Sequence, residues 1–169
     1  MLLRRKSLSN EEILFCSKKI TEKLINIIDK LKPKRVHIYI DRENEVKTNF
    51  LIDKCISDIE LFTPEVNCYK KEIRHKRITS NYSLSKETFD DIENLDIIVV
   101  PGVAFNKRCM RLGFGGGFYD RFLSNKNCLK IGVSYDWQII QKVPICCHDE
   151  MLDIVVTEKR IIEQKNYSK

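Results

Sequence analysis

Short apolar runs rich in β-branched residues alternate along this chain with segments of helical periodicity. The clearest run, Leu-Asp-Ile-Ile-Val-Val at residues 95–100, has the nearly continuous hydrophobicity of a strand that is buried on both faces. Further strand-like runs occupy residues 35–40, 59–63, 130–135 and 153–157. Strands that alternate with helices are typical of a three-layer α/β domain, in which helices flank a largely parallel sheet. The chain shows no linker or internal repeat, so we expect residues 1–169 to form one such domain.

The helices between these strands carry start and stop signals of their own. Ser9 and Glu12 form a capping box, and apolar residues follow it at helical spacing. We therefore expect a long helix over residues 9–31, which ends before Pro33. Shorter helices are expected at residues 48–56, 118–123 and 137–142.

The polar stretch between residues 66 and 91 gives the weakest structural signal. Its charged residues lack a clear period, so it is predicted to be a hairpin or an excursion over the surface. The strand before it is expected to end at Pro64.

The composition is that of an ordinary soluble globular protein, with 43% hydrophobic and 32% charged residues. No apolar run approaches the ~20 residues that span a bilayer, and the start of the chain lacks the apolar core of a secretory signal. The seven cysteines are an odd number without a Cys-x-x-Cys pair, which argues against a disulfide framework or a zinc ribbon. We therefore expect a cytoplasmic enzyme with reduced thiols and no membrane partner.

The net charge of +6 is confined to the first 35 residues, which hold ten Lys or Arg and four Asp or Glu. Such a basic segment can bind RNA, complement a polyanionic small ligand or lie as a solvated helix face. No aromatic residue interleaves with Arg4, Arg5 and Lys6, which weakens the case for single-stranded nucleic acid. We expect no nucleic-acid partner.

The most specific local pattern is Arg-Leu-Gly-Phe-Gly-Gly-Gly-Phe-Tyr-Asp at residues 111–120, which holds four of the six glycines. Clustered glycines reach positive φ and let backbone N–H groups converge on an anion, to which the following helix adds its positive end. Arg111 can bind phosphate, and Asp120 can bind a hard cation such as Mg²⁺. The stretch follows the 95–100 strand, at the edge where α/β sheets bind ligands. We interpret it as a nucleotide phosphate site, with a flexible turn as the alternative.

Further segments form one pattern with this stretch. Val-Pro-Gly-Val-Ala-Phe-Asn stands at residues 100–106, Asn-Glu-Val-Lys-Thr at 44–48, and His-Asp-Glu-Met-Leu-Asp at 148–153. In this order they resemble the central, second and C-terminal motifs of the 5-formyltetrahydrofolate cyclo-ligases, also called 5,10-methenyltetrahydrofolate synthetases. Arg4-Arg5-Lys6-Ser-Leu-Ser9 matches the start of the first helix in that family, so the resemblance covers nearly the whole chain.

The resemblance implies a Rossmann-like fold of the NagB/RpiA-like kind and a defined reaction. That reaction is the ATP-dependent closure of 5-formyltetrahydrofolate to 5,10-methenyltetrahydrofolate, with release of ADP and phosphate. ATP would phosphorylate the formyl oxygen, and N10 of the folate would attack the activated carbon. The protein would position two ligands and neutralise phosphoryl charge. It would act as a monomer on a folate that can carry a polyglutamate tail.

The resemblance also assigns residues to the ligands and to a metal. Glu45, Arg111 and Asp120 would be catalytic, with Glu45 orienting the reacting end of the folate. ATP would bind Arg4, Arg111, Leu112, Gly113, Phe114, Gly115, Gly116, Gly117, Phe118 and Tyr119. The folate would bind Ile40, Glu45, Phe114, Gly115, Gly116, Gly117 and Phe118. Mg²⁺ would bind Asp120 and Asp153.

Departures from the family keep alternatives open. The basic Lys-x-x-Leu-Arg element that usually precedes the Arg4 match is absent, which puts the first ATP contacts in question. Lys47 stands where the family has aspartate, and His148 is interpreted as structural rather than as a base. A folate-binding protein without turnover and a sugar-phosphate isomerase on a similar scaffold are the alternatives.

Overall fold

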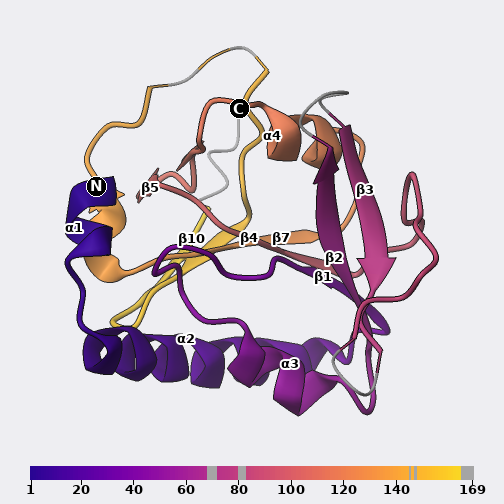
Figure 1. The fold of residues 1–169 in the computed structure, drawn as a ribbon. Coiled ribbons are helices and arrows are strands. Elements are labelled where there is room, and N and C mark those ends of the chain that lie inside the picture. The colour runs from indigo at the N-terminus through magenta and orange to yellow at the C-terminus, as the bar shows by residue number, and fades with distance from the viewer. Residues whose placement is uncertain (68–71, 80–82, 145, 147, 165–169) are drawn as a thin grey trace.

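The computed structural model describes residues 1–67, 72–79, 83–144, 146 and 148–164 (Figure 1). Within these ranges the main sheet has seven strands in the order β10-β9-β7-β4-β1-β2-β3. They are β1 (Arg35–Ile38), β2 (Glu60–Asn67), β3 (Glu72–Arg77), β4 (Ile97–Val100), β7 (Leu129–Val133), β9 (Ile154–Val156) and β10 (Ile161–Glu163). A smaller sheet in the order β6-β5-β8 contains β5 (Ala104–Asn106), β6 (Arg111–Leu112) and β8 (Ile139–Ile140).

The centre of the main sheet is parallel, as the sequence predicted. Strands β9, β7, β4, β1 and β2 pair in parallel, while β3 and β10 add antiparallel edges. The chain lays β2 on one side of β1, then places β4 on its other side and continues outward to β7 and β9. The direction in which successive strands are added to the sheet therefore reverses between β1 and β4. Open α/β sheets bind ligands at such a switch point, beyond the carboxyl ends of the strands.

Three layers form because β4 is apolar on both faces. Ile97 and Val99 pack toward α2 (Asn10–Leu31) and α3 (Asn49–Cys55), which cover one face of the sheet (Figure 1). Ile98 and Val100 pack toward Phe105 of the smaller sheet and toward α4 (Phe118–Leu123) on the other face. The predicted three-layer α/β architecture is confirmed. Among the described residues no helix is both long and apolar enough to cross a membrane.

The long helix α2 begins and ends where its signals predict. The Ser9 hydroxyl accepts from the Glu12 N–H at 3.2 Å, and the Glu12 carboxylate accepts from the Ser9 N–H at 2.8 Å. The helix ends at Leu31, and its C-cap Lys32, whose φ of 48° is left-handed, lies directly before Pro33. A separate short helix, α1 (Leu2–Lys6), precedes the capping box and was not predicted. It carries the first basic residues of the chain.

The prediction that a strand ends at Pro64 is wrong, because β2 continues to Asn67. His75 lies opposite Pro64 and directs its own N–H and C=O to Phe89, at 2.8 Å each, on the side away from β2. The pairing of Pro64 with His75 therefore needs no N–H from Pro64. On the other side of β2, the pairing with β1 stops at Phe62, so the proline disrupts neither ladder.

For residues 66–91, one of the two predicted alternatives is confirmed at the start of the stretch, where β2 and β3 pair as a hairpin; the connecting residues 68–71 lie outside the described residues. One further expectation is corrected. The helix expected at residues 137–142 is only a 3₁₀ turn, Asp136–Gln138, followed directly by β8. β8 pairs with β5, and this tertiary pairing overrides the local helical pattern.

Candidate active site

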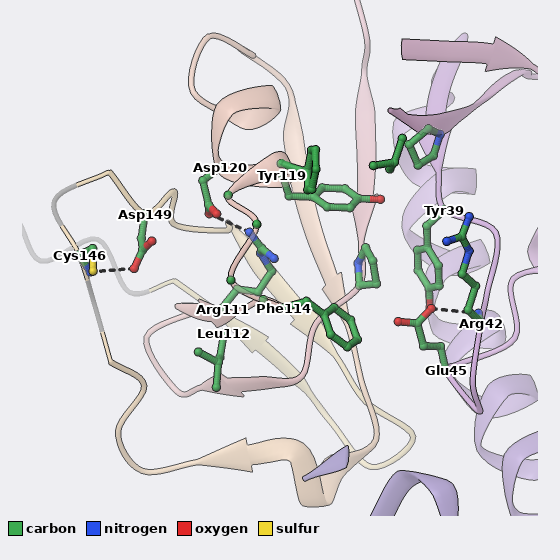
Figure 2. Close-up of a pocket in the computed structure, with 18 of the residues that line it drawn as sticks. Tyr39, Arg42, Glu45, Arg111, Leu112, Phe114, Tyr119, Asp120, Cys146 and Asp149 are labelled. Carbon is green, nitrogen blue, oxygen red and sulfur yellow. Dashed lines mark hydrogen bonds and ion pairs between the residues drawn. The ribbon is translucent and has the colours of Figure 1, made fainter. Parts of the chain in front are cut away.

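A pocket of about 470 Å³ lies at the switch point between β1 and β4 (Figure 2). One wall is the segment that follows β1, including Tyr39, Ile40, Arg42 and Glu45. The opposite wall runs from the end of β6 to the first turn of α4, residues 111–120. The loop before β9 closes a third side with Asp149. The volume of the pocket is in the range of small-molecule sites.

The glycine loop, residues 113–117, presents bare backbone to this pocket. Gly115 and Gly117 have φ of 87° and 62°, which side chains rarely adopt, so the loop needs glycine at both positions. Among the described residues, no acceptor takes the backbone N–H groups of Gly115, Gly116 and Gly117. Free N–H groups beside the start of α4 favour an anion, as the sequence predicted for this stretch.

Arg111 and Asp120 form an ion pair across the glycine loop, with 2.7 Å between Nη2 and Oδ1 (Figure 2). The Arg111 guanidinium also lies 5.5 Å from the centre of the Tyr119 ring. Its Nε is buried without a partner among the described residues, so Arg111 retains a donor. A guanidinium with donor capacity in the wall of a pocket is suited to phosphate.

The Glu45 loop, residues 39–48, is held in place by side chains. The Tyr39 hydroxyl donates to the Val46 carbonyl at 2.8 Å, and the Tyr135 hydroxyl donates to the Asn44 carbonyl at 2.9 Å. Glu43 and Asn44 adopt left-handed φ of 42° and 60°, so the chain turns sharply just before Glu45. This turn directs Glu45 into the interior rather than into solvent.

The Glu45 side chain is a buried carboxylate at the pocket wall, and the residue is only 8% exposed. It accepts a hydrogen bond from the Arg42 N–H at 3.0 Å and lies 3.5 Å from Nη1 of Arg5. Burial raises the pKa of Glu45, while the Arg42 N–H and the Arg5 guanidinium act in the opposite direction. The arrangement provides one carboxylate that can bind N–H groups of a ligand.

Arg4, which the sequence assigned to ATP, does not line this pocket. Its guanidinium stacks 4.7 Å from the centre of the Trp137 ring, in a separate hollow that also contains Glu12 and Glu158. The neighbouring Arg5 points inward instead and reaches Glu45. Because successive helical residues point in different directions, packing alone decides which of the two enters the site.

Asp153, which the sequence assigned to Mg²⁺, also lies away from the pocket. Its N–H bonds the Lys130 carbonyl at 3.0 Å, and its Oδ2 accepts from the Lys130 N–H at 2.8 Å. These contacts place it at the amino ends of β7 and β9, whereas the pocket lies at the carboxyl ends. Asp149 of the same motif lines the pocket and accepts a hydrogen bond from the Cys146 N–H at 2.8 Å (Figure 2).

The remaining predicted residues meet at one place. The pocket is lined by the carboxylate, the basic residue, the glycines and the aromatic residues that the sequence singled out: Ile40, Glu45, Arg111, Leu112, Gly113, Phe114, Gly115, Gly116, Gly117, Phe118, Tyr119 and Asp120. Sequence reasoning missed Asp149 and Arg42 as lining residues. His148 is exposed and does not line the pocket. Fold and pocket together define an α/β protein with a ligand pocket at the switch point of its sheet.

Comparisons with known proteins agree with this fold. The sequence matches the 5-formyltetrahydrofolate cyclo-ligase family over residues 1–158. It is 33% identical to the 5-formyltetrahydrofolate cyclo-ligase of Mycoplasma genitalium over 147 residues, covering 82% of each chain. The structure is similar to that of the 5,10-methenyltetrahydrofolate synthetase of Aquifex aeolicus, with a TM-score of 0.81, 31% identity and coverage of 99% of this chain and 91% of that one. The corresponding synthetase of Mycoplasma pneumoniae gives a TM-score of 0.76 at 29% identity, over 93% of both chains.

This chain belongs to the 5-formyltetrahydrofolate cyclo-ligase family. It is a ligase of folate metabolism, and its function is the conversion of 5-formyltetrahydrofolate to 5,10-methenyltetrahydrofolate. The family resemblance seen in the sequence motifs is thereby confirmed. A sugar-phosphate isomerase, the alternative on a similar scaffold, has no support from these relatives.

Proposed function

We propose that this enzyme closes 5-formyltetrahydrofolate with the use of ATP and Mg²⁺ and releases ADP and phosphate. The observation that carries the proposal is one pocket with two different walls. One wall is a glycine loop whose N–H groups have no acceptor among the described residues, and the other carries a buried carboxylate, Glu45. One wall suits an anion and the other suits an N–H donor. A reaction in which a nucleotide transfers a phosphoryl group to a folate needs both.

The chemistry explains why a phosphate site is required. The formyl oxygen is a poor leaving group, so the γ-phosphoryl group of ATP is first transferred to it and ADP is formed. N10 of the folate then bonds to the activated carbon and loses its proton. The carbon–oxygen bond breaks and the oxygen leaves as inorganic phosphate. Each step depends on the positions of two ligands and on neutralisation of phosphoryl charge.

The phosphate half of the site consists of the glycine loop and Arg111. In the described part of the chain the N–H groups of Gly115, Gly116 and Gly117 have no acceptor, so they can bind phosphate oxygens, and Arg111 adds a guanidinium. The first turn of α4 directs its N–H groups toward the same region. These groups act as fixed dipoles, so little reorganisation is needed when charge moves from ATP to the formyl oxygen.

Two carboxylates fit the metal. Asp120 from α4 and Asp149 from the loop before β9 both line the pocket, whereas Asp153 does not. No cluster of three or more His, Cys, Asp or Glu side chains occurs in the part of the chain that the structure describes. That fits Mg²⁺, which typically takes one or two carboxylates and completes its shell with water and phosphate oxygens. Asp120 and Asp149 would hold Mg²⁺, which would supply positive charge that neutralises the phosphates.

The folate half of the site consists of Glu45 with apolar neighbours. As a carboxylate, Glu45 accepts hydrogen bonds from N–H groups at the reacting end of the folate and stabilises positive charge near N10. Ile40 and Phe118 line the same pocket and offer apolar and aromatic surface to the pterin. Burial strengthens these contacts because little water competes for the carboxylate.

The direct test is to mix the purified protein with 5-formyltetrahydrofolate, Mg²⁺ and ATP and to follow the near-ultraviolet absorbance of the methenyl product. ATP-dependent growth of that band is expected, with none when ATP is omitted. Folate binding without turnover, measured by calorimetry, would instead establish a folate-binding protein. A shift of thermal stability by phosphorylated sugars and not by folates would favour an isomerase.

The metal assignment has its own matched pair of variants. Asp149→Asn is expected to lower turnover and to raise the Mg²⁺ concentration needed for half-maximal rate, because Asp149 lines the pocket. Asp153→Asn removes the same charge from the opposite edge of the sheet, so it should leave the Mg²⁺ dependence unchanged. A Mg²⁺ dependence altered by Asp153→Asn alone would reverse the assignment.

The finer attributes are proposed on the same basis. We expect a cytoplasmic monomer that acts on folates with or without a polyglutamate tail. Light scattering of the purified protein measures its oligomeric state. A comparison of KM for the monoglutamate and triglutamate substrates measures its preference for a polyglutamate tail.

A further inference from the structure

Arg5 stands apart from the other basic residues near the start of the chain. It lies on the five-residue helix α1 and is 3% exposed, although arginine is rarely buried unless it is paired. The charged partner that the structure gives it is Glu45, at 3.5 Å between Nη1 and Oε1. A buried guanidinium and a buried carboxylate thus meet at the pocket wall.

Arg5 contacts both loops that face the ligands. Its carbonyl accepts a hydrogen bond from Nδ2 of Asn44 at 3.2 Å, which ties α1 to the Glu45 loop. Its guanidinium lies 5.6 Å from the centre of the Phe114 ring, within the distance of a cation–π contact, and Phe114 belongs to the glycine loop. One residue of a short terminal helix therefore joins the two walls of the pocket.

The groups around Glu45 partly oppose and partly favour its negative charge, so the ion pair with Arg5 matters for that charge. On its own loop, Asp41 opposes the charge of Glu45, while Arg42 favours it through its N–H and its guanidinium. Burial raises the pKa of the Tyr119 hydroxyl on α4 and of the Tyr39 hydroxyl just after β1, and the charge of Glu45 adds to both shifts. Burial favours the protonated carboxyl, and the Arg5 guanidinium opposes that effect directly.

We propose that Arg5 is a positioning residue of this active site, which holds the Glu45 carboxylate charged and oriented toward the folate and couples the glycine loop to it. This inference rests on the proposed role of Glu45 in folate binding. Without Arg5, the buried carboxylate has lost its ion-pair partner and takes up a proton at higher pH. A protonated Glu45 accepts fewer N–H groups and no longer stabilises positive charge on the folate.

Arg4 provides a matched control for Arg5. It has the same side chain and lies next to Arg5 on α1, but it stacks on Trp137 outside the pocket. Arg4→Met and Arg5→Met remove the same charge and a similar volume from the same helix. A general effect of net charge or of α1 stability should therefore appear in both variants, and an effect through Glu45 only in Arg5→Met.

The experiment measures the affinity for 5-formyltetrahydrofolate by calorimetry across the acid and neutral pH range, alongside turnover of the wild type. Arg5→Met is expected to weaken folate binding about 10- to 100-fold, because a hydrogen-bonded charge is lost. Its affinity should also begin to fall at higher pH than in the wild type. Arg5→Lys should restore much of the affinity, and Arg4→Met should change it by about twofold or less.

A double-mutant cycle shows whether Arg5 acts through Glu45. In a Glu45→Gln background, Arg5→Met is expected to change folate affinity by about twofold or less. Full additivity of the two substitutions, or an unshifted pH dependence in Arg5→Met, would overturn the inference even if the wild type turns over normally. A wild type that binds folate but forms no product would overturn the proposed reaction and leave the Arg5 result to stand by itself.

Discussion

The two walls of the pocket differ in what they present to a ligand. The glycine loop, residues 113–117, offers backbone N–H groups that have no partner within the residues the structure describes, and Gly115 and Gly116 are exposed. The Glu45 loop, residues 39–48, offers one buried side chain, and hydrogen bonds from Tyr39, Asn44 and Tyr135 fix its path. An anion site needs bare backbone that a phosphate can approach closely. A carboxylate site needs a charge that the rest of the fold keeps in place, so its construction depends on distant residues.

The largest effect should come from the phosphate wall. Asp120→Asn is expected to reduce turnover by about 10²- to 10³-fold, because a proposed metal ligand and the partner of Arg111 are both lost. Folate affinity, measured by calorimetry, should stay close to that of the wild type. The melting temperature serves as the control for folding. Retained product formation at the wild-type rate would remove Asp120 from the metal site.

The opposite pattern is expected at the folate wall. Glu45→Gln keeps the size of the side chain but removes its charge, so folate affinity should fall about 10- to 100-fold. The KM for ATP should change little, since ATP is assigned to the other wall. Steady-state kinetics with each substrate varied in turn separates the two constants. Equal losses for both ligands would mean that the two walls do not serve separate ligands.

The same contrast explains how much the sequence could predict. The buried strand at 95–100, the glycine stretch and the helix after it depend on neighbouring residues, and the structure has them as β4, the glycine loop and α4. The Glu45 loop gave a weaker signal, because its left-handed positions are Glu43 and Asn44 rather than glycines. Asparagine is among the residues that tolerate this conformation, so Asn44 can adopt it without a glycine to mark the turn.

Two site residues required the fold. Arg4 and Arg5 are neighbours on one helix, and nothing local distinguishes the one that packs against Glu45 from the one that stacks on Trp137. Asp149 and Asp153 belong to one motif, but only the sheet shows which edge each of them reaches. Asp153 directly precedes β9 and therefore lies at the amino edge, a conclusion that the predicted strand at 153–157 already allowed.

A buried histidine pair packs against α4 and should make the fold sensitive to acid. Nε2 of His37 in β1 and Nδ1 of His75 in β3 are 3.0 Å apart, and Phe122 of α4 packs on both rings. Burial lowers the pKa of His75 to about 4 and that of His37 well below its usual value. Both pKa values lie below the unfolded value of about 6.5. The stability from the neutral pair is therefore complete above that pH and is lost as pH falls toward 4.

The free energy of unfolding should fall by on the order of 1.4 kcal/mol per pH unit for each histidine. Urea unfolding at a series of pH values measures this fall. His75→Gln removes one titrating group, so its stability should depend less steeply on pH between about 6.5 and 4. Carboxylates titrate in both proteins and cancel in the difference. Equal slopes for the wild type and the variant would show that the pair does not titrate as its burial requires.

The smallest expected effects separate a loop that can relax from one that cannot. Gly115 has φ of 87°, and a Cβ added there would meet nothing within 4 Å, so Gly115→Ala introduces only backbone strain, roughly 1–2 kcal/mol. The exposed loop can relieve that strain in the free enzyme by changing φ. The cost then appears when phosphate binds, as an increase of about 5- to 30-fold in KM for ATP at an unchanged melting temperature.

Asn44→Ala places a similar strain at φ of 60° in the Glu45 loop and also removes the hydrogen bond to the Arg5 carbonyl. This loop cannot change φ without breaking its contact with Tyr135, so the cost should appear in the free protein. The melting temperature should fall by about 2–4 °C for each kcal/mol lost. Scanning calorimetry of the two variants measures the contrast directly. If Gly115→Ala melted early while Asn44→Ala did not, the rigid wall of the pocket would be the glycine loop and not the one that carries Glu45.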